Sequence, residues 1–233
     1  MSIASNLEGI EKRIQQACRR ATRERASVTL VGVSKRHPAG AIVEAMDTTD
    51  LRHFGENYVQ EYVEKRQQLE DKSEALWHFI GHLQRNKVRQ LLAYPPALVH
   101  SVDSIALIDT LERVMSELHP EQKLPILIEL RIGDEDGEKT GLAPELLDDV
   151  AAHLAGCPHL DWQGLMLIPP LGRAAEASRP YFQAVRQKFE AINAVRQTPL
   201  TVLSYGMSDD FEVAIEEGAT HIRIGTAIFG ARQ

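Results

Sequence analysis

Two kinds of hydrophobic pattern alternate along the chain. Short apolar runs bounded by turn residues are typical of buried strands, and longer segments repeat their apolar positions every three or four residues, as amphipathic helices do. We expect strands at residues 28–33, 51–54, 78–80, 98–101, 126–130, 164–168, 200–203 and 221–224. We expect helices among the intervening segments at 39–46, 58–69, 105–118, 144–154, 180–195 and 209–217. A further helix is expected over residues 5–25, with a narrow apolar stripe of Leu7, Ile10, Ile14, Ala17 and Ala21.

Strict alternation of strands and helices predicts parallel strands joined by right-handed crossovers. Eight such units in a chain of 233 residues predict a closed α/β barrel, the (β/α)8 or TIM-barrel fold. An open, doubly wound sheet is the alternative, although no Gly-x-Gly-x-x-Gly turn follows the first strand to favour a dinucleotide-binding version. No linker or repeat divides the sequence. We therefore expect one domain over residues 1–233, with the N-terminal helix of residues 1–25 packed on the barrel.

Composition narrows the class of protein. The chain has 26 basic and 33 acidic residues and a formal net charge of −7, which argues against the nucleic-acid backbone as main partner. Its two cysteines, Cys18 and Cys157, form neither a disulfide framework nor a paired-cysteine metal motif. The N-terminus does not read as a signal peptide and no stretch approaches a membrane span, so we expect a cytoplasmic protein. The charged segment 133–141 is expected to be a mobile loop.

Polar residues stand directly after the expected strands. In a parallel barrel the carboxyl ends of all strands meet at one mouth, where active sites lie. After the eight strands, in order, come Ser34-Lys35, Gly55-Glu56-Asn57, Gly81-His82-Leu83-Gln84, Asp103, Arg131, Pro169-Pro170, the stretch from Ser204 to Ser208, and Arg223 with Gly225-Thr226. Their convergence predicts a site for a small polar ligand. His78 and His82 are four residues apart in an extended stretch, so we expect no metal site there.

Lys35 is the candidate for covalent chemistry. A lysine that attacks an aldehyde must lose its proton, which a partly dry pocket or a neighbouring cation promotes. The apolar run 28–33 leads directly into Lys35 and should bury its root. The alternative is a lysine whose ammonium simply reaches solvent at the end of a strand, and position alone favours that alternative.

Two turns near the C-terminus are candidates for a phosphate site. Gly206 permits an unusual backbone angle, Ser208 is expected to open a helix, and the Gly225-Thr226 turn adds amides and a hydroxyl. The loops after strands seven and eight of such barrels frequently bind phosphate. The alternative is that Ser208 is a routine helix cap. Asp209 and Asp210 favour this alternative, because their carboxylates would repel a dianion if they pointed inward.

The expected position of Arg223 favours a ligand site. Alternation along strand eight puts Arg223 and Gly225 on one face and the two flanking isoleucines on the other, so Arg223 should point into the barrel. A buried guanidinium needs an acceptor because it cannot lose its charge. A ring nitrogen or a carboxylate of a ligand would serve. A structural ion pair with Glu129 is the alternative.

Motifs spread over nearly the whole chain carry a family resemblance. They are Val33-Ser34-Lys35 with Pro38, Phe54-Gly55-Glu56-Asn57-Tyr58-Val59-Gln60-Glu61, Trp77-His78-Phe79-Ile80-Gly81-His82-Leu83-Gln84-Arg85-Asn86-Lys87, His100-Ser101-Val102-Asp103-Ser104, Gly164-Leu165-Met166, Gly206-Met207-Ser208-Asp209-Asp210 and Arg223-Ile224-Gly225-Thr226-Ala227-Ile228-Phe229-Gly230. In this order they resemble the pyridoxal-phosphate homeostasis protein family, which is similar to the N-terminal barrel of alanine racemase standing alone.

The resemblance implies a role for each site residue. Lys35 would form an internal aldimine with pyridoxal 5'-phosphate, and Arg223 would face the pyridine nitrogen. The residues that would hold the phosphate, partly through backbone amides, are Ser204, Ser208, Gly225 and Thr226. Asn57 and Met207 would line the cofactor. Two positions depart from the commonest pattern of the family: Tyr205 replaces a frequent methionine, and Leu167 stands where a small or polar residue is usual. Both bear on the local shape of the pocket.

The resemblance and the residues together favour a carrier over a catalyst. Racemisation needs two bases, of which Lys35 supplies one, and the opposing tyrosine of the racemase comes from a second domain that we expect this chain to lack. Arg223 beside the ring nitrogen would also disfavour its protonation and weaken the ring as an electron sink. We therefore expect a monomer that stores or delivers pyridoxal phosphate with little turnover, with apo pyridoxal-phosphate enzymes as candidate recipients.

Two other functions remain open on the sequence. One is an amino-acid racemase or similar pyridoxal-phosphate enzyme. The other is a phosphate-binding barrel enzyme in which Lys35 forms no covalent bond.

Overall fold

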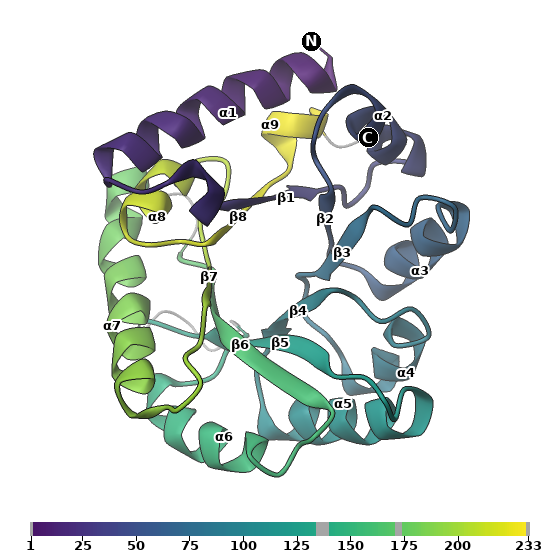
Figure 1. Cartoon of the computed structure of the whole chain (residues 1–233), viewed down its shortest axis with the longest axis vertical. Coiled ribbons are helices and arrows are strands. Elements are labelled where there is room, and N and C mark those ends of the chain that lie inside the picture. The colour runs from purple at the N-terminus through teal and green to yellow at the C-terminus, as the bar shows by residue number, and fades with distance from the viewer. Residues whose placement is uncertain (1, 134–139, 171–173, 232–233) are drawn as a thin grey trace.

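A ring of strands forms the centre of the computed structural model, which describes residues 2–133, 140–170 and 174–231. Within these residues eight parallel strands close into a barrel, and β8 pairs with β1 (Figure 1). The strands are β1 (Thr29–Val33), β2 (His53–Glu56), β3 (Leu76–Phe79), β4 (Leu98–Val102), β5 (Leu124–Leu130), β6 (Leu160–Leu167), β7 (Val202–Ser204) and β8 (His221–Ile224). An open sheet has two edge strands, each paired on one side only, and this ring has none. The closure therefore excludes the open, doubly wound sheet and confirms the (β/α)8 prediction.

Helices surround the ring and cover its strands (Figure 1). They are α1 (Ile3–Arg20), α2 (Ala39–Thr48), α3 (Val59–Gln68), α4 (Val88–Leu91), α5 (Ile105–Leu118), α6 (Leu147–Leu154), α7 (Arg179–Val195), α8 (Phe211–Glu216) and α9 (Thr226–Phe229), with short 3₁₀ turns at Arg25–Ser27, Arg85–Lys87, Pro144–Leu146 and Ala175–Ser178. Helix α5 matches its predicted bounds. Helices α4 and α9 were not predicted, because four residues are too few to show a helical period.

The N-terminal helix α1 packs its apolar stripe on the barrel. Ser2 caps the helix by accepting a hydrogen bond from the N–H of Ser5. The helix ends at Arg20 and not at residue 25 as predicted, because Thr22 takes a left-handed conformation (φ 54°) and the N–H of Arg23 donates to the Cys18 carbonyl. This arrangement is a Schellman-type termination, which the sequence pattern does not reveal without a glycine. Figure 1 shows α1 running beside α8 and α9.

Several strand bounds differ from the predictions. Strand β2 runs over His53–Glu56, two residues later than predicted, because the buried Glu56 continues the ladder opposite Phe79. Strand β3 starts two residues before the predicted 78–80 segment and ends at Phe79. Strand β6 begins at Leu160, four residues early. In β6 the polar residues Asp161 and Gln163 interrupt the hydrophobic pattern, so the pattern alone underestimates the length of this strand.

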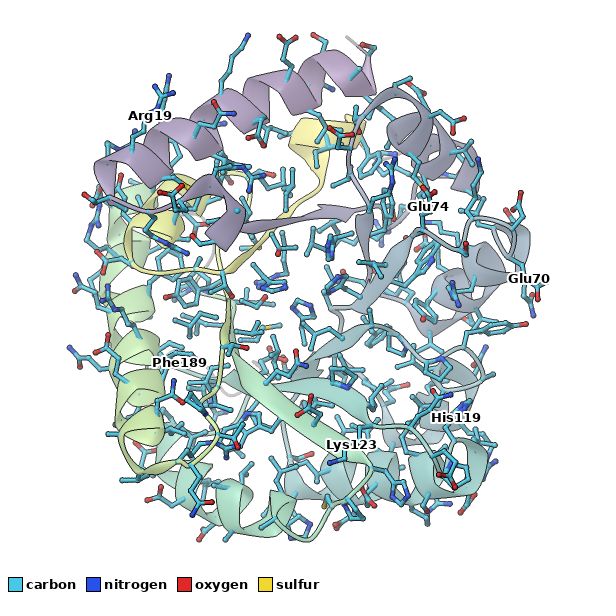
Figure 2. All side chains as sticks on the ribbon, in the orientation of Figure 1. Arg19, Glu70, Glu74, His119, Lys123 and Phe189 are labelled. Atoms are coloured by element: carbon cyan, nitrogen blue, oxygen red, sulfur yellow. The ribbon has the colours of Figure 1, made fainter. Side chains whose placement is uncertain are left out.

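The main hydrophobic core lies between the strands and the surrounding helices, and side chains also fill the ring itself (Figure 2). Inside the barrel a small apolar cluster consists of Leu98, Leu127, Met166 and Val202. Buried polar side chains on the strands of the barrel include His78, His100, Glu129, Ser204 and Arg223. The interior of this barrel is therefore unusually polar, since branched apolar residues dominate most such interiors.

The described residues contain no helix long and apolar enough to cross a membrane. Across the same residues, no group of three or more His, Cys, Asp or Glu side chains is placed to hold a metal ion. Of the charged loop expected at 133–141, residues 134–139 lie outside the described ranges.

Candidate functional site

A cavity of about 140 Å³ opens at the mouth of the barrel where the carboxyl ends of the strands meet. Its lining consists of Val33, Lys35, His37, Asn57, Ile80, Ile168, Met207, Ser208, Arg223, Gly225 and Thr226. Every predicted site residue except Ser204 belongs to this lining. Residues from far-separated parts of the sequence meet here because all strands of a parallel barrel end on the same side. We call this space the C-terminal cavity.

The segment that carries Lys35 is held on both sides of that residue. The preceding Ser34 is fully buried; its hydroxyl donates to Glu56 Oε1 at 2.6 Å, and its carbonyl accepts from Lys65 Nζ at 2.7 Å. The backbone N–H of Arg36, which has a left-handed φ of 61°, donates to Glu61. Lys35 itself is half-buried and lines the C-terminal cavity. Its backbone is thus fixed before its side chain contacts any ligand.

A buried ion pair underlies this segment. Lys65 Nζ lies 2.7 Å from Glu56 Oε1 and 2.9 Å from Glu61 Oε1, and neither Lys65 nor Glu56 exposes more than 4% of its surface. Burial raises the pKa of the Glu56 carboxyl, and the charge of Lys65 and the hydroxyl of Ser34 oppose that shift. Glu56 could be placed near the end of strand two from the sequence, without a role, and Lys65 was not predicted. The Glu61–Lys65 spacing of four residues on a helix was the available signal.

Asn57 presents an unsatisfied acceptor at the cavity. Its side-chain oxygen Oδ1 is buried and has no hydrogen-bond partner among the described residues. Gly81 packs against the Asn57 backbone so closely that a Cβ there would lie 2.1 Å from the Asn57 carbonyl oxygen. A glycine is therefore required at residue 81 for Asn57 to occupy its place. Buried acceptors without a partner are rare in native proteins, and one in a cavity wall indicates a ligand contact.

The turn after β7 differs from the prediction. Helix α8 begins at Phe211, so Ser208 does not cap it, and the side chain of Asp210 instead accepts from the N–H of Met207 at 2.7 Å. Gly206 takes a left-handed φ of 93°, which lets the chain reverse into this turn. Asp210 is buried against the turn, Asp209 is exposed, and neither lines the cavity. These carboxylates therefore do not form part of the cavity wall, although the charge of Asp210 still acts on Arg223.

Arg223 reaches the C-terminal cavity from the interior of the barrel. It is 4% exposed; one terminal nitrogen donates to Ser204 Oγ at 2.7 Å and the other to the Leu167 carbonyl at 3.0 Å. Burial lowers the pKa of Arg223 to about 10, against the charges of Glu129 and Asp210, so the guanidinium stays protonated at neutral pH. Glu129, the partner that the structural alternative required, accepts a hydrogen bond from Thr140 at 3.0 Å. Ser204 lies beneath Arg223 and orients it, which places this serine behind the cavity wall.

The profile of one family, described as alanine racemase, N-terminal domain, matches residues 5–233. A pyridoxal phosphate homeostasis protein of Aquifex aeolicus (strain VF5) is 40% identical over 233 residues, and the match covers 100% of both chains. The protein of the same description in Escherichia coli (strain K12) is 42% identical over 235 residues, covering 99% of this chain and 97% of that one. This chain belongs to the pyridoxal phosphate homeostasis protein family.

A solved structure extends the comparison to three dimensions. PipY of Synechococcus elongatus PCC7942, described as having PLP bound, is 36% identical and superposes with a TM-score of 0.85, covering 98% of this chain and 100% of PipY. The family resemblance drawn from the motifs is thereby confirmed, together with the alanine-racemase-like barrel.

The two departures from the family pattern lie outside the cavity. Tyr205 points into the outer layer, where its ring stacks on Phe182 with centroids 4.7 Å apart and its hydroxyl donates to the Glu217 carbonyl. Leu167 contributes its backbone carbonyl to Arg223. Neither residue is in the cavity lining. Their side chains therefore do not form the cavity wall, and Leu167 acts on the cavity through the carbonyl that holds Arg223.

Sequence reasoning missed part of the lining. His37 is buried two residues after Lys35 and packs on Phe229, with ring centroids 5.4 Å apart. Its place between Lys35 and Pro38 in the first motif was the available signal. Val33, Ile80 and Ile168 complete the apolar part of the wall. Apolar residues at strand ends cannot be told from core residues by pattern alone, so they were not predicted as site residues.

Proposed function

We propose that this protein binds pyridoxal 5'-phosphate in the C-terminal cavity and serves its homeostasis by storing or delivering it. The observation that carries the proposal is the convergence in one small cavity of an amine, Lys35, an unsatisfied buried acceptor, Asn57 Oδ1, and a buried cation, Arg223. The turns at Ser208 and at Gly225-Thr226 add hydroxyls and amides on the wall. These groups fit a flat ring that carries an aldehyde, a ring nitrogen and a phosphate. The description of the relatives as pyridoxal phosphate homeostasis proteins, and of PipY as having PLP bound, supports the same assignment.

In this proposal Lys35 would supply the amine that condenses with the aldehyde carbon, and the aldehyde oxygen would leave as water. When bound, the cofactor supplies an electrophilic aldehyde and a ring that can accept electron density. The Ser34, Glu56, Lys65 and Glu61 contacts hold the backbone on each side of Lys35, so the amine starts from a defined position. Ser208, Gly225 and Thr226 would bind the phosphate, Met207 would pack on the cofactor, and Ser204 would act through Arg223.

Arg223 is the reason to propose storage over turnover. A guanidinium can only donate, so it would bind the ring nitrogen as an acceptor and oppose its protonation. An unprotonated ring stabilises a carbanion poorly, which weakens every reaction that starts by removing a proton from a bound amino acid. Amino-acid racemisation is the competing function. Incubation with L-alanine in heavy water separates the two, because rapid deuterium exchange at Cα would favour the racemase.

The proposal is tested by reduction and mapping. The purified protein is incubated with pyridoxal phosphate, its visible absorbance is recorded, and it is treated with borohydride before peptide mapping. We expect a visible band that reduction removes and a mass increase on the peptide that contains Lys35, both absent in Lys35→Ala. Lys72→Ala is the matched control and should behave as wild type. It loses only an ion pair in which Lys72 Nζ lies 3.4 Å from Asp47 Oδ1. A colourless protein with no adduct would instead support a phosphate-binding barrel enzyme.

The proposal extends to the organisation and setting of the protein. We propose that residues 1–233 act as one domain with α1 packed on the barrel, and that the protein is a cytoplasmic monomer that binds neither nucleic acid nor membranes. The net charge of −7 and the two free, buried cysteines support this setting. Light scattering of the purified protein measures the oligomeric state. Transfer of cofactor to apo pyridoxal-phosphate enzymes is measured by their regained activity.

A further inference from the structure

Histidines fill positions in the barrel interior that apolar residues occupy in most such barrels. His53 begins β2, His78 lies in β3, His100 in β4 and His221 in β8. His78 and His100 expose 2% and 0% of their surface. Burying polar rings costs free energy unless every nitrogen is hydrogen-bonded, and apolar side chains of similar volume would avoid that cost. The interior therefore contains a feature that packing alone does not require.

Three of these rings form a continuous chain of hydrogen bonds. His53 Nδ1 lies 2.9 Å from His78 Nε2, and His78 Nδ1 lies 2.8 Å from His100 Nε2. The chain continues from His100 Nδ1 to Ser204 Oγ at 2.8 Å, and Ser204 Oγ accepts from Arg223 at 2.7 Å. His221 packs beside the chain, with its ring centroid 6.0 Å from that of His78, and its Nδ1 lies 3.0 Å from Thr220 Oγ1.

The chain has only two proton arrangements that keep its rings neutral. A neutral imidazole has one donor and one acceptor nitrogen, so His78, bonded to a histidine on each side, must donate to one and accept from the other. Either every ring carries its proton on Nε2 and donates towards His53, or every ring carries it on Nδ1 and donates towards Ser204. Burial lowers the pKa of both His78 and His100 well below the ordinary value, which keeps these rings neutral near pH 7.

Arg223 selects one of the two arrangements. Its guanidinium can only donate, so Ser204 Oγ must accept from it. Among the described residues, His100 Nδ1 is the one acceptor recorded for the Ser204 hydroxyl proton. If His100 also donated to Ser204, that proton would be buried without a partner, at a cost that the other arrangement avoids. The donors therefore all point from Arg223 towards His53.

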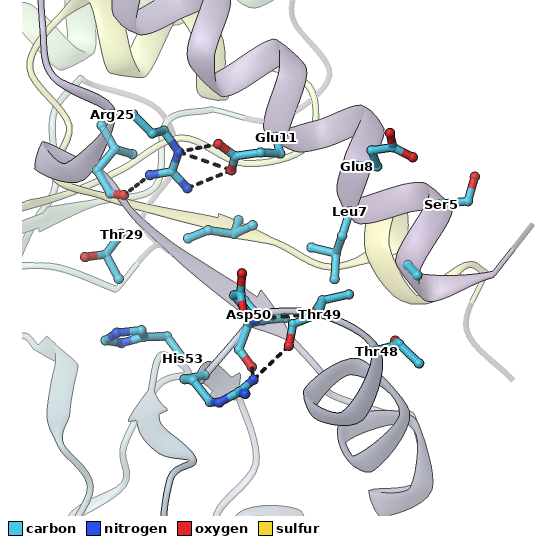
Figure 3. Close-up of a pocket in the computed structure, with 15 residues that line it drawn as sticks. Ser5, Leu7, Glu8, Glu11, Arg25, Thr29, Thr48, Thr49, Asp50 and His53 are labelled. Atoms are coloured by element: carbon cyan, nitrogen blue, oxygen red, sulfur yellow. Dashed lines mark hydrogen bonds and ion pairs between the residues drawn. The ribbon is translucent and has the colours of Figure 1, made fainter.

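The two ends of the chain open on different cavities. Arg223 lines the C-terminal cavity. His53 lines a larger cavity of about 860 Å³ at the opposite mouth, between α1 and the beginnings of β1 and β2 (Figure 3). We infer that His53, His78, His100 and Ser204 form a polarised relay that positions the Arg223 guanidinium at the cofactor cavity. The relay transmits a change in the hydrogen bonding of Arg223 to the opposite mouth of the barrel. These are positioning residues, since they act through Arg223. Only the link to cofactor rests on the proposed function.

The relay is tested by assigning the tautomer of each ring. Long-range ¹H–¹⁵N spectra of protein labelled in its histidines, recorded at pH 7.5 without cofactor, distinguish a protonated from an unprotonated ring nitrogen. We expect His53, His78 and His100 all to be protonated on Nε2. A mixed set, or His100 protonated on Nδ1, would overturn the relay. This measurement needs no variant and so does not depend on how substitutions fold.

Two variants at residue 223 test what sets the direction. Arg223→Lys keeps a side chain that can only donate, and we expect the wild-type tautomers at all three rings. Arg223→Gln supplies a carboxamide oxygen that can accept the Ser204 proton, which makes the reverse arrangement possible. We expect the resonances of His100, His78 and His53 to shift together in this variant. An unchanged spectrum, or a shift at His100 without one at His53, would show that the rings are not coupled.

A matched serine variant controls for general disturbance of the barrel. Ser101→Ala removes a buried hydroxyl on β4 that is not part of the relay and donates to the Gly81 carbonyl. This variant should leave the three tautomers unchanged. Addition of pyridoxal phosphate then tests transmission, with an expected shift of the His53 nitrogens. If Lys35 is modified and His53 does not shift, transmission is wrong. If Lys35 is not modified at all, the proposed function fails while the relay is still judged by the Arg223 variants.

Discussion

The polar side chains at the two mouths of the barrel differ in whether they have hydrogen-bond partners. At the N-terminal mouth the arginines are already paired: Arg25 makes several contacts to Glu11 and bonds the Val28 carbonyl, as Figure 3 shows, and Arg52 bonds three backbone carbonyls. At the C-terminal mouth Asn57 Oδ1 has no partner among the described residues. The larger cavity thus has the more satisfied walls.

This difference shows why cavity size alone does not locate a binding site. Polar groups that bond to each other stabilise the fold and have little left to offer a ligand. A buried acceptor without a partner costs stability until a ligand satisfies it, so one that lies in a cavity wall points to binding. The support beneath the C-terminal mouth, which includes Lys65 and Glu56, is itself fully buried. Substitutions that are matched between the two mouths can test this comparison.

The largest contrast is expected from the two ion pairs. Lys65→Met leaves the Glu56 carboxylate buried without its cation and should lower the free energy of unfolding by about 3–5 kcal/mol. Arg25→Met, at the other mouth, breaks a pair whose side chains are 33% and 37% exposed and should cost about 1 kcal/mol or less. Urea denaturation at pH 7 measures both. Equal losses would contradict the comparison, and Lys65→Met combined with Glu56→Leu should recover part of the stability.

The histidines between the mouths should make stability depend on pH. Burial lowers the pKa of His78 and His100, and lowers that of His221 from 6.5 to about 4. The unfolded chain then binds more protons below pH 6.5, so stability present above that pH is lost as the pH falls towards 4. His221 alone should account for about 3 kcal/mol of this loss.

Unfolding free energies measured at intervals from pH 7.5 to pH 4 test this, with His221→Gln as the reference. The difference between wild type and variant isolates the histidine from Glu56 and Glu129, whose carboxyl pKa values are raised by burial and act in the opposite direction. A difference that does not change with pH would show that His221 is not buried as a neutral ring.

Two glycines near opposite mouths should respond with opposite sign. Gly81→Ala forces a Cβ against the Asn57 carbonyl and should lower the free energy of unfolding by about 1–3 kcal/mol while displacing Asn57. Gly9 is exposed and lies within α1, away from both ends of the helix. The Cβ of Gly9→Ala would have no heavy atom within 4 Å. This substitution should raise stability by about 0.5–1 kcal/mol. Thermal and urea unfolding measure both changes, and a tolerated Gly81→Ala would show that Asn57 is not fixed by this contact.

The smallest expected effects compare two asparagines, one with and one without hydrogen-bond partners for its side-chain oxygen. Asn57→Ala removes an acceptor that has no protein partner, so apo stability should change by less than about 1 kcal/mol while pyridoxal phosphate affinity falls about threefold to tenfold. Asn193→Ala removes two bonds to the Leu200 backbone and should lower stability by about 1–2 kcal/mol without changing affinity. Absorbance titration gives the affinities. Loss of stability without loss of affinity in Asn57→Ala would reverse its assignment.

Much of the fold could be predicted because it depends on local pattern. Strand β8 and helix α5 have their predicted bounds, since each is a regular apolar pattern with turn residues at both ends. Lys35, Asn57 and Arg223 could be placed at one mouth because parallel strands of a closed barrel all end there. Ser208 was predicted as a helix cap and is not one, since Asp210 competes for the same turn and its side chain bonds Met207 instead.

The sequence by itself determined the order of strands and helices and which polar residues stand near the carboxyl ends of the strands, because periodicity and turn chemistry act over a few neighbouring residues. Only the tertiary structure decided which side chains meet inside the ring. His53, His78, His100 and Ser204 come from four different strands, and their contacts depend on the stagger between strands, which no local pattern encodes. The same stagger turns Tyr205 outward and leaves Arg223 between Ser204 and the cavity.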